Sequence, residues 1–243
     1  MRIAVISDLH GNMDAVSGMM GSIEDADRII CLGDVVGIGP DPAEVLETVL
    51  DDERISWVLG NHDVNTRDGT ELGPLREIKR RPHHEWVRGE LGDLVLGIEA
   101  PMSLSLEASG RTLTFMHRHP DDCGSAVPYF DHPFPSVLDD FYSDVEGDIL
   151  FFGHTHIPLM VSGSRLYVNP GAVGAENGGI ASAVILDAED GMQLAVRRVR
   201  YDLEAVRKRL REKAAPYYKY ISAHFFSEKG YTPSPLMISN KTG

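Results

Sequence analysis

The sequence places aspartate, histidine and asparagine residues directly after short apolar runs, and these residue types bind metal ions. The seven residues are Asp8, His10, Asp34, Asn61, His117, His154 and His156. Carboxylate, imidazole and amide donors suit Mn²⁺, Fe, Zn²⁺ or Ni²⁺, and the absence of cysteine from the set disfavours a structural zinc site. The pattern predicts a polynuclear metal centre.

The apolar runs before these residues are the elements that must position them. Each run has the length and composition of a buried strand. The expected strands are Ile3–Ser7, Arg28–Leu32, Ser56–Leu59, Leu113–Met116 and Ile149–Phe152. Ligands in α/β sheets bind beyond the carboxyl ends of the strands. We therefore expect an α/β protein in which five strand ends converge on one site.

Two metal ions in such a site would suit hydrolysis at phosphorus. An aspartate between two ions can bridge them with its two oxygens, and Asp34 is the natural residue for this. Ions ~3.5–4 Å apart clamp the attacking and leaving oxygens and lower the pKa of a shared water, which supplies a bridging hydroxide. No serine or cysteine nucleophile is then needed. Among the seven residues, His117 has a nearby rival in His119.

Composition narrows the class of protein. The 243 residues carry a net charge of −14, which argues against a general nucleic-acid or anionic-membrane binder. The two cysteines, Cys31 and Cys123, give no disulfide framework and suggest a reducing compartment. No run approaches the ~20 apolar residues of a membrane span. We expect a cytoplasmic protein.

Two helices are expected between the first strands. Asn12 is a good cap for a helix with apolar positions from Met13 to Ile23. Asp41 can cap the next helix, with Pro42 in its first turn and Glu44 closing a capping box. The apolar face of that second helix comprises Val45, Leu46, Val49 and Leu50.

Residues 64–110 form a long insertion between the third and fourth donor-bearing strands. A helix is expected over Leu75–Arg81, with Pro82 ending it. The following His83-His84-Glu85 is interpreted as a solvated loop and not as a zinc motif, because adjacent histidines point to different faces. A strand over Met102–Ala108 then turns into the strand before His117.

The C-terminal part is expected to add strands and one helix to a single domain of residues 1–243. A loop (118–135) and a helix (Ser136–Tyr142) precede the last donor-bearing strand, and hairpins follow His156. Asp202 should cap a helix that ends before Pro216. This helix and an aromatic tail, about 202–243, should pack on the domain, although the tail aromatics could instead form a homo-oligomer contact.

The motifs together resemble a known superfamily. They are Asp8-x-His10, Gly33-Asp34, Gly60-Asn61-His62-Asp63, His117 and Gly153-His154-Thr155-His156, and they are similar to those of the calcineurin-like metallophosphoesterases. The run from Gly33 to Pro42 looks like that of the small prokaryotic phosphodiesterases related to diadenosine tetraphosphatases. The resemblance implies a four-layer αββα sandwich of two mixed β-sheets flanked by helices, with metals at the sheet ends.

The resemblance also implies roles for individual residues. One ion would take Asp8, His10, Asp34 and His156, and the other would take Asp34, Asn61, His117 and His154. His62 would be the catalytic general acid, or an electrostatic aid to the leaving oxygen. Asn12 and Arg118 are candidates for substrate contact, though Asn12 could equally be a cap and Arg118 a solvated side chain.

The resemblance points to a phosphodiesterase more than to a protein phosphatase. Protein serine/threonine phosphatases of the superfamily carry an Asp-Arg pair where this chain has Gly37-Ile38-Gly39, and an arginine where it has Leu59. We predict a two-metal hydrolase, with Mn²⁺ expected first, acting on a small or nucleotide-like phosphodiester. The alternatives are a phosphomonoesterase, a dinucleoside polyphosphate hydrolase, or a catalytically silent scaffold on the same fold.

Overall fold

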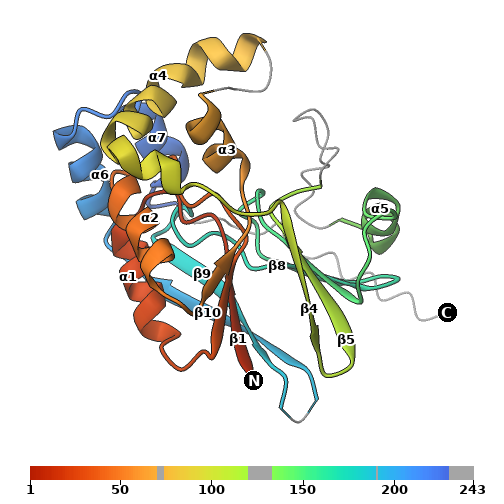
Figure 1. Cartoon of the computed structure of the whole chain (residues 1–243). Helices are drawn as coiled ribbons and strands as arrows, with labels where there is room; N and C mark the ends of the chain where they lie inside the picture. Colours follow the sequence, from red (N-terminus) through yellow and green to blue (C-terminus); the bar gives the residue numbers. More distant parts are fainter. Residues whose placement is uncertain (70–73, 120–132, 190, 230–243) are drawn as a thin grey trace.

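Two β-sheets form the centre of the molecule, and helices lie on either side of them (Figure 1). The computed structural model describes residues 1–69, 74–119, 133–189 and 191–229. Cys123 and most of the expected 118–135 loop lie outside these residues, as does the end of the C-terminal tail.

The first sheet has five strands in the order β10-β9-β1-β2-β3. The strands β1 (Arg2–Ile6), β2 (Arg28–Cys31) and β3 (Ile55–Trp57) run parallel. The hairpin of β9 (Ile180–Asp187) and β10 (Gln193–Arg200) is antiparallel and joins the sheet beside β1. The three parallel strands deliver the first three donor-bearing loops to one edge.

The second sheet has the order β4-β5-β6-β8-β7 and is also mixed. Its bounds are β4 (Ser103–Ala108), β5 (Arg111–Met116), β6 (Ile149–Phe152), β8 (Leu166–Asn169) and β7 (Leu159–Ser162). The strands β5, β6 and β8 are parallel, while β4 and β7 are antiparallel to their neighbours. His117 and His154 follow the parallel pair β5 and β6.

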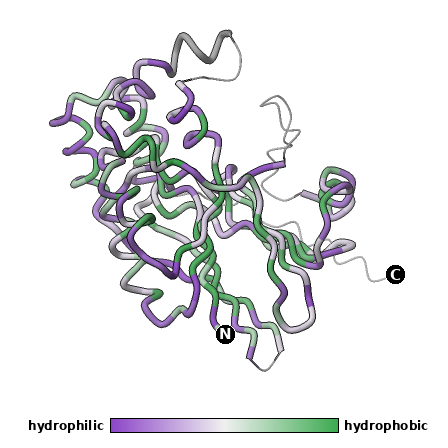
Figure 2. Tube along the Cα trace, in the orientation of Figure 1, coloured by the Kyte–Doolittle hydropathy of each residue, from purple (hydrophilic) through white to green (hydrophobic). Residues whose placement is uncertain are grey.

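The two sheets pack face to face, as strand β1 makes clear. Ile3 and Val5 belong to the apolar cluster between the sheets, together with Phe115 and Phe151 of the second sheet. Ala4 and Ile6, on the opposite face, belong to the cluster under the helices. This alternation follows from the two-residue period of a strand buried on both faces, and the sheets form the most hydrophobic part of the trace (Figure 2).

Helices complete the outer layers. The helices α1 (Met13–Ser22), α2 (Pro42–Asp51) and α4 (Pro74–Leu91) share an apolar cluster with the first sheet. Helix α5 (Pro135–Phe141) packs its Leu138 on the far face of the second sheet. The arrangement confirms the expected four-layer sandwich of two mixed sheets flanked by helices. Helix α3 (Asn61–Asp68) and a 3-10 helix (Gly92–Gly97) complete this half of the chain.

The caps of the first two helices differ from one another. Asn12 caps α1 as expected, because its side-chain oxygen accepts a hydrogen bond from the Ala15 N–H at 3.3 Å. Asp41 does not cap α2 with its side chain; its carboxylate instead accepts from the Met13 N–H. Leu50 was expected on the apolar face of α2, but its side chain is 43% exposed and lies outside the buried face.

The C-terminal helices pack on the first sheet's side of the molecule. Asp202 caps α6 (Leu203–Glu212) as expected, and α7 (Tyr218–Phe225) follows. Phe226, from the aromatic tail, is fully buried in a cluster with α6 and α7, whereas Tyr220 is exposed. None of the helices in the described ranges has the length and apolarity that crossing a membrane requires.

Candidate metal centre

Backbone hydrogen bonds join the first two donor-bearing loops. The Asp8 N–H donates to the Gly33 carbonyl at 3.0 Å, and the His10 N–H donates to the Asp34 carbonyl at 2.8 Å. These bonds continue the parallel pairing of β1 and β2 beyond the strand ends. Asp8, His10 and Asp34 therefore lie together because of the sheet.

Most of the expected ligands have an unusual backbone conformation. The positive-φ ligands are Asp8 (54°), His10 (47°), Asp34 (52°), His154 (68°) and His156 (60°). Left-handed conformations are uncommon outside glycine, although aspartate and histidine are enriched among the exceptions. Such residues gather at functional sites, where the surrounding structure holds them in place.

The carboxylate of Asp8 is oriented by two donors on one oxygen. Its Oδ2 accepts from the Ser7 hydroxyl at 2.6 Å and from the His154 N–H at 3.1 Å. Its Oδ1 is buried, makes no hydrogen bond, and lies 3.3 Å from His156 Nε2. That Nε2 atom is in turn 2.9 Å from Nε2 of His10. Three potential ligand atoms thus face one another in a small buried space.

Asp34 is oriented in the same way and lies between the two groups of donors. Its Oδ1 accepts from the His62 N–H at 2.7 Å. Its Oδ2 lies 3.7 Å from Nε2 of His10 and 3.3 Å from Nε2 of His117. A side chain at Gly60 would collide with Oδ1, so the glycine before Asn61 is required for this approach.

The second group of donors surrounds His117. Its Nε2 atom lies 3.1 Å from Asn61 Oδ1 and 3.2 Å from His154 Nδ1. The ligand atoms of Asp34, His117 and His154 lie within 4.8 Å of one another, as do those of Asp8, His10 and His156. The structure therefore brings all seven expected residues together, in two groups with Asp34 beside both.

The outer ring nitrogens fix the orientation of two of these histidines. Nδ1 of His117 donates to the Leu32 carbonyl at 2.9 Å, and Nδ1 of His156 donates to the Ala175 carbonyl at 3.0 Å. When its Nε2 is deprotonated, as metal binding requires, each ring directs the Nε2 lone pair into the centre, as is usual for metal-binding histidines. Lone pairs this close repel unless a cation lies between them. The donor set fits two divalent ions.

The charges of the centre also favour cations. Burial would raise the pKa of Asp8 and of Asp34, yet nearby histidines hold both below the ordinary aspartate value. His156 is the main cause for Asp8, and His117 for Asp34. Two buried carboxylates that stay ionised need positive charge next to them.

The histidines of the centre differ in the protonation that the surrounding side chains favour. Burial lowers the pKa of His10 to about 4, so this ring is neutral and ready to bind an ion. Burial also acts to lower the pKa of His117, but the charge of Asp34 outweighs it and raises this pKa to about 9. A proton on His117 supplies part of the positive charge that an ion would bring.

Asp63 holds the loop before Asn61 in place, and the sequence motif alone assigned it no role. It is fully buried, and its carboxylate accepts from the Gly60 N–H at 2.9 Å and from the Val36 N–H at 3.1 Å. Burial, with a smaller contribution from Asp34, raises its pKa to about 7. An acid three residues after a helix cap is the signature of a capping box, and this signal could have revealed it.

The two residues expected to contact substrate, Asn12 and Arg118, have different surroundings in the structure. Asn12 is fully buried, and its amide donates to the Gly174 carbonyl at 2.8 Å while its oxygen caps α1. It therefore acts as the cap that the sequence also allowed, and its substrate contact stays a prediction. Arg118 is half-buried next to His117, and its substrate contact stays a prediction. His119 bonds Asp144 at 2.8 Å, and the structure selects His117 for the centre.

The structure contradicts the solvated loop expected at His83 and His84. Helix α4 continues through Pro82 to Leu91, and both histidines are only 6% exposed. Nε2 of His83 donates to the Gly37 carbonyl at 2.9 Å. The ring of His84 lies against the ring of His62. The insertion therefore reaches the metal centre and contributes to its wall.

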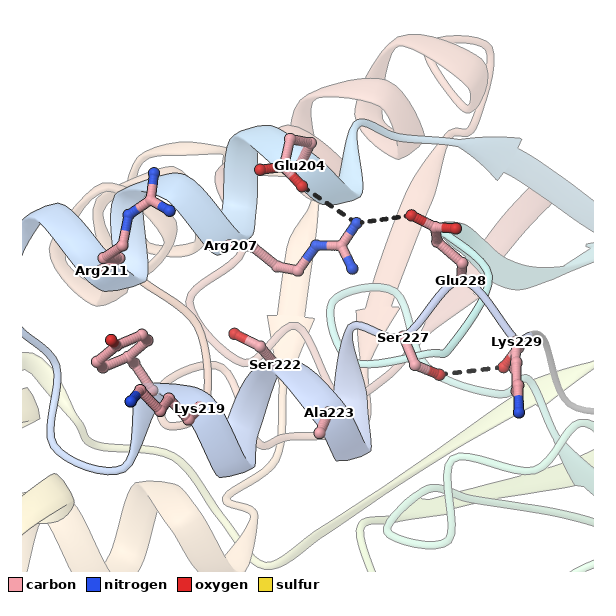
Figure 3. Close-up of a pocket in the computed structure, with 10 residues that line it drawn as sticks. Glu204, Arg207, Arg211, Lys219, Ser222, Ala223, Ser227, Glu228 and Lys229 are labelled. Atoms are coloured by element: carbon pink, nitrogen blue, oxygen red, sulfur yellow. Dashed lines mark hydrogen bonds and ion pairs between the residues drawn. The ribbon is translucent and has the colours of Figure 1, made fainter.

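A separate groove of about 720 Å³ lies between α6 and α7 (Figure 3). Its charged lining comprises Glu204, Arg207, Arg211, Lys219, Glu228 and Lys229. Arg207 pairs with Glu204 and with Glu228, each at 3.2 Å. None of the seven donor residues lines this groove, so its cationic side chains are not part of the metal centre.

With the geometry established, comparison with known proteins identifies the family. Residues 1–191 match the calcineurin-like phosphoesterase superfamily domain. The chain belongs to this superfamily. The match covers all seven donors, and it confirms the superfamily that the motifs indicated.

Individual proteins are similar to this chain in sequence or in fold. The chain is 29% identical to the uncharacterized protein MJ0912 of Methanocaldococcus jannaschii, over 88% of this chain and 93% of that protein. Its fold is similar to a metallophosphoesterase of Sphaerobacter thermophilus (TM-score 0.75, 24% identity, 94% and 99% coverage). It is also similar to the hypothetical protein PH1004 of Pyrococcus horikoshii (TM-score 0.80, 18% identity, 95% and 99% coverage).

Proposed function

We propose that the protein is a metal-dependent phosphoesterase that hydrolyses a small or nucleotide-like phosphodiester. The observation that carries the proposal is the position of Asp34 Oδ2, which lies between His10 and His117 at the junction of two buried donor groups. Membership of the calcineurin-like phosphoesterase superfamily supports the same reaction class.

In this proposal each donor group holds one divalent ion. The first ion is held by Asp8, His10, Asp34 and His156, and the second by Asp34, Asn61, His117 and His154. The distances among the ligand atoms support both sets. Mixed oxygen and imidazole ligands suit manganese, which is our first expectation, and also iron, zinc or nickel. When bound, the ions would polarise the phosphoryl oxygens and lower the pKa of water, which supplies the nucleophile.

His62 is the residue proposed to donate a proton to the leaving oxygen. Its ring nitrogen lies within 4.8 Å of ligand atoms of both His10 and Asp34, so it borders the two ion sites. Its backbone N–H is bonded to Asp34, which couples its position to the shared ligand. A general acid must lie within hydrogen-bond reach of the group it protonates, and the position of His62 beside His10 and Asp34 supports this role for a phosphate held between the ions.

The charges near the site support the proposed preference for a diester. A phosphomonoester is largely a dianion near pH 7, whereas a diester carries one charge per phosphate. Enzymes that bind terminal phosphoryl groups commonly add arginines, whose planar guanidinium matches two phosphate oxygens. The chain has Leu59 before Gly60, and Arg118 is the arginine adjacent in sequence to a ligand.

The experiment that tests the proposal combines metal analysis with a substrate screen. Freshly purified protein should contain close to two ions per chain, and anomalous scattering should place them on either side of Asp34. Protein loaded with Mn²⁺ should hydrolyse bis-nitrophenyl phosphate. A single ion held elsewhere, or full metal loading with no hydrolysis of any mono- or diester, would contradict the proposal; the second result would instead support a scaffold.

A further inference from the structure

The ring of His62 is enclosed by side chains from two different parts of the chain. On one side lies His10, with ring centroids 5.0 Å apart and planes at 84°. On another lies His84 of α4, with centroids 5.3 Å apart and planes at 71°. His84 is only 6% exposed, so its ring is part of the packed interior. A strand-end residue and an inserted helix thus contact the same imidazole.

His83, the residue before His84, hydrogen-bonds to the backbone at Gly37, which lies against the His62 ring. His83 donates to the Gly37 carbonyl at 2.9 Å, and its other ring nitrogen lies 3.2 Å from the Pro216 carbonyl. A Cβ atom at Gly37 would lie 2.8 Å from Nδ1 of His62, which shows how closely the Gly37 backbone approaches that ring. One turn of α4 therefore sets both the backbone beneath His62 and the ring beside it.

We propose that His84 is a positioning residue for His62, and that its ring sets the angle of the His62 imidazole through their edge-to-face contact. This inference rests on the proposed role of His62 as the proton donor to the leaving oxygen. In this proposal His84 binds neither ion nor substrate and acts through its contact with His62.

The physical reason is the weak intrinsic preference of a histidine ring for any one orientation. The terminal torsion of histidine is broad, so packing decides where the ring nitrogens point. Edge-to-face contact with a second ring restricts that torsion. Proton donation needs the nitrogen aimed at the leaving oxygen, and a displacement of about 1 Å can cost on the order of 10²-fold in rate.

The test compares two substitutions of similar bulk. His84→Leu fills the space without a planar ring, and His84→Phe keeps the ring. For a methyl or other alkyl phosphodiester, whose leaving group needs a proton, His84→Leu should lower kcat by about 10-fold. With bis-nitrophenyl phosphate the loss should stay below about twofold, because nitrophenolate leaves unprotonated. His84→Phe should keep kcat close to wild type, and metal content should be unchanged in both.

A second background shows whether His84 acts through His62. In the His62→Ala protein, adding His84→Leu should change kcat by less than about twofold, since the group being positioned is gone. Equal losses from His84→Leu in the two backgrounds would overturn the proposal. So would equal losses for alkyl and nitrophenyl leaving groups, which would indicate a general loosening of the site.

A structural measurement separates this inference from the proposed function. In protein labelled at histidine, the side-chain resonances of His62 should shift and broaden in His84→Leu and stay near their wild-type values in His84→Phe. Unchanged His62 resonances in His84→Leu would overturn the inference whatever the kinetics. If His62→Ala itself left every activity intact, the proposed role of His62 would fail, and the resonances would still decide whether His84 positions its ring.

Discussion

The metal centre and the groove between α6 and α7 both gather groups suited to phosphate, but they hold them differently. In the centre four of the seven donor residues are buried and the other three are half-buried, and each carboxylate is oriented by hydrogen bonds, as Asp8 is by Ser7 and His154. In the groove Arg211 and Lys219 are exposed, and Arg207 is already paired with two glutamates. Exposed charges contribute little and are screened by salt. Fixed geometry, more than cationic charge, marks the site where chemistry is expected.

Removing Asp34 should produce the largest effect, because it borders both donor groups. Asp34→Ala should bind neither ion fully and should lose more than about 10³-fold in kcat/KM, beyond the loss typical of a single stabilising hydrogen-bond donor. Metal analysis and bis-nitrophenyl phosphate hydrolysis measure this. Asp144→Ala, which removes an acid outside the centre, is the control. Retained activity in Asp34→Ala would show that hydrolysis does not depend on the metal centre, and the groove would then become the candidate site.

Removing the His62 ring should leave the ions in place. His62→Ala should retain its metal and lose ~10²–10⁴-fold in kcat, the usual contribution of a general acid or base. The loss should be smaller for nitrophenyl esters than for alkyl esters, because nitrophenolate needs little protonation. Equal losses for the two classes would indicate that His62 only shapes the site.

Metal binding should depend on pH, whereas anion binding by arginines in the groove should not. The pKa of His117 is raised to about 9 in the metal-free protein, so at pH 7 an ion must displace its proton. Affinity should therefore rise about tenfold per pH unit between pH 7 and 9 for one released proton. Calorimetry in buffers of different ionisation enthalpy counts the protons.

The same raised pKa predicts the stability of the metal-free fold. Because the folded-state pKa of His117 lies above the unfolded value of 6.5, its contribution is fully present below pH 6.5 and is lost as pH rises to 9. Without metal, the thermal unfolding temperature at pH 9 should reflect this loss of stability relative to pH 6. With metal bound, the difference that His117 causes should disappear. Affinity independent of pH would contradict the protonation assigned to His117.

Substrate charge gives a smaller effect. Bis-nitrophenyl phosphate should be hydrolysed with a several-fold higher kcat/KM than nitrophenyl phosphate, measured with one metal at one pH. A clear monoester preference would overturn the phosphodiesterase proposal and leave the metal centre intact. If that preference vanished in Arg118→Ala, Arg118 would be the phosphate-binding group.

The groove should give the smallest effect of all. Arg211→Gln and Lys219→Gln remove exposed charges that contact none of the seven donors. Each should change kcat/KM by less than about twofold at physiological ionic strength. A loss comparable to that of His62→Ala would show that the groove takes part in substrate binding.

The strand ends were predictable because local sequence decides them. Short apolar runs followed by Asp8, Asp34 or His154 need no distant partner to be interpreted, and the structure has strands at all five expected places. The grouping of the ligands also followed, because parallel strands bring their carboxyl ends to one edge.

The parts that escaped prediction depend on distant contacts. Asp41 is drawn from its cap position by Arg209, whose guanidinium donates to its carboxylate at 3.0 and 2.9 Å from 168 residues away. Pro82 removes one backbone donor from α4, yet His83, His84 and Val87 are buried in the turns that follow it, and the helix continues through the proline to Leu91. Tertiary packing overrides local propensity in both places.

The left-handed backbone at five of the proposed ligands lowers the stability of the fold while it places their side chains in the centre. A non-glycine residue in this conformation costs on the order of 1 kcal/mol, and five ligands adopt it, among them Asp34 and His156. Glycine at either position would relax the backbone but remove a ligand. Binding of the proposed ions would offset the cost, because anything that binds only the folded chain stabilises it. A descendant that no longer needed to bind metal would therefore gain stability from glycine at these left-handed positions. Each such substitution would relax the backbone and remove one ligand.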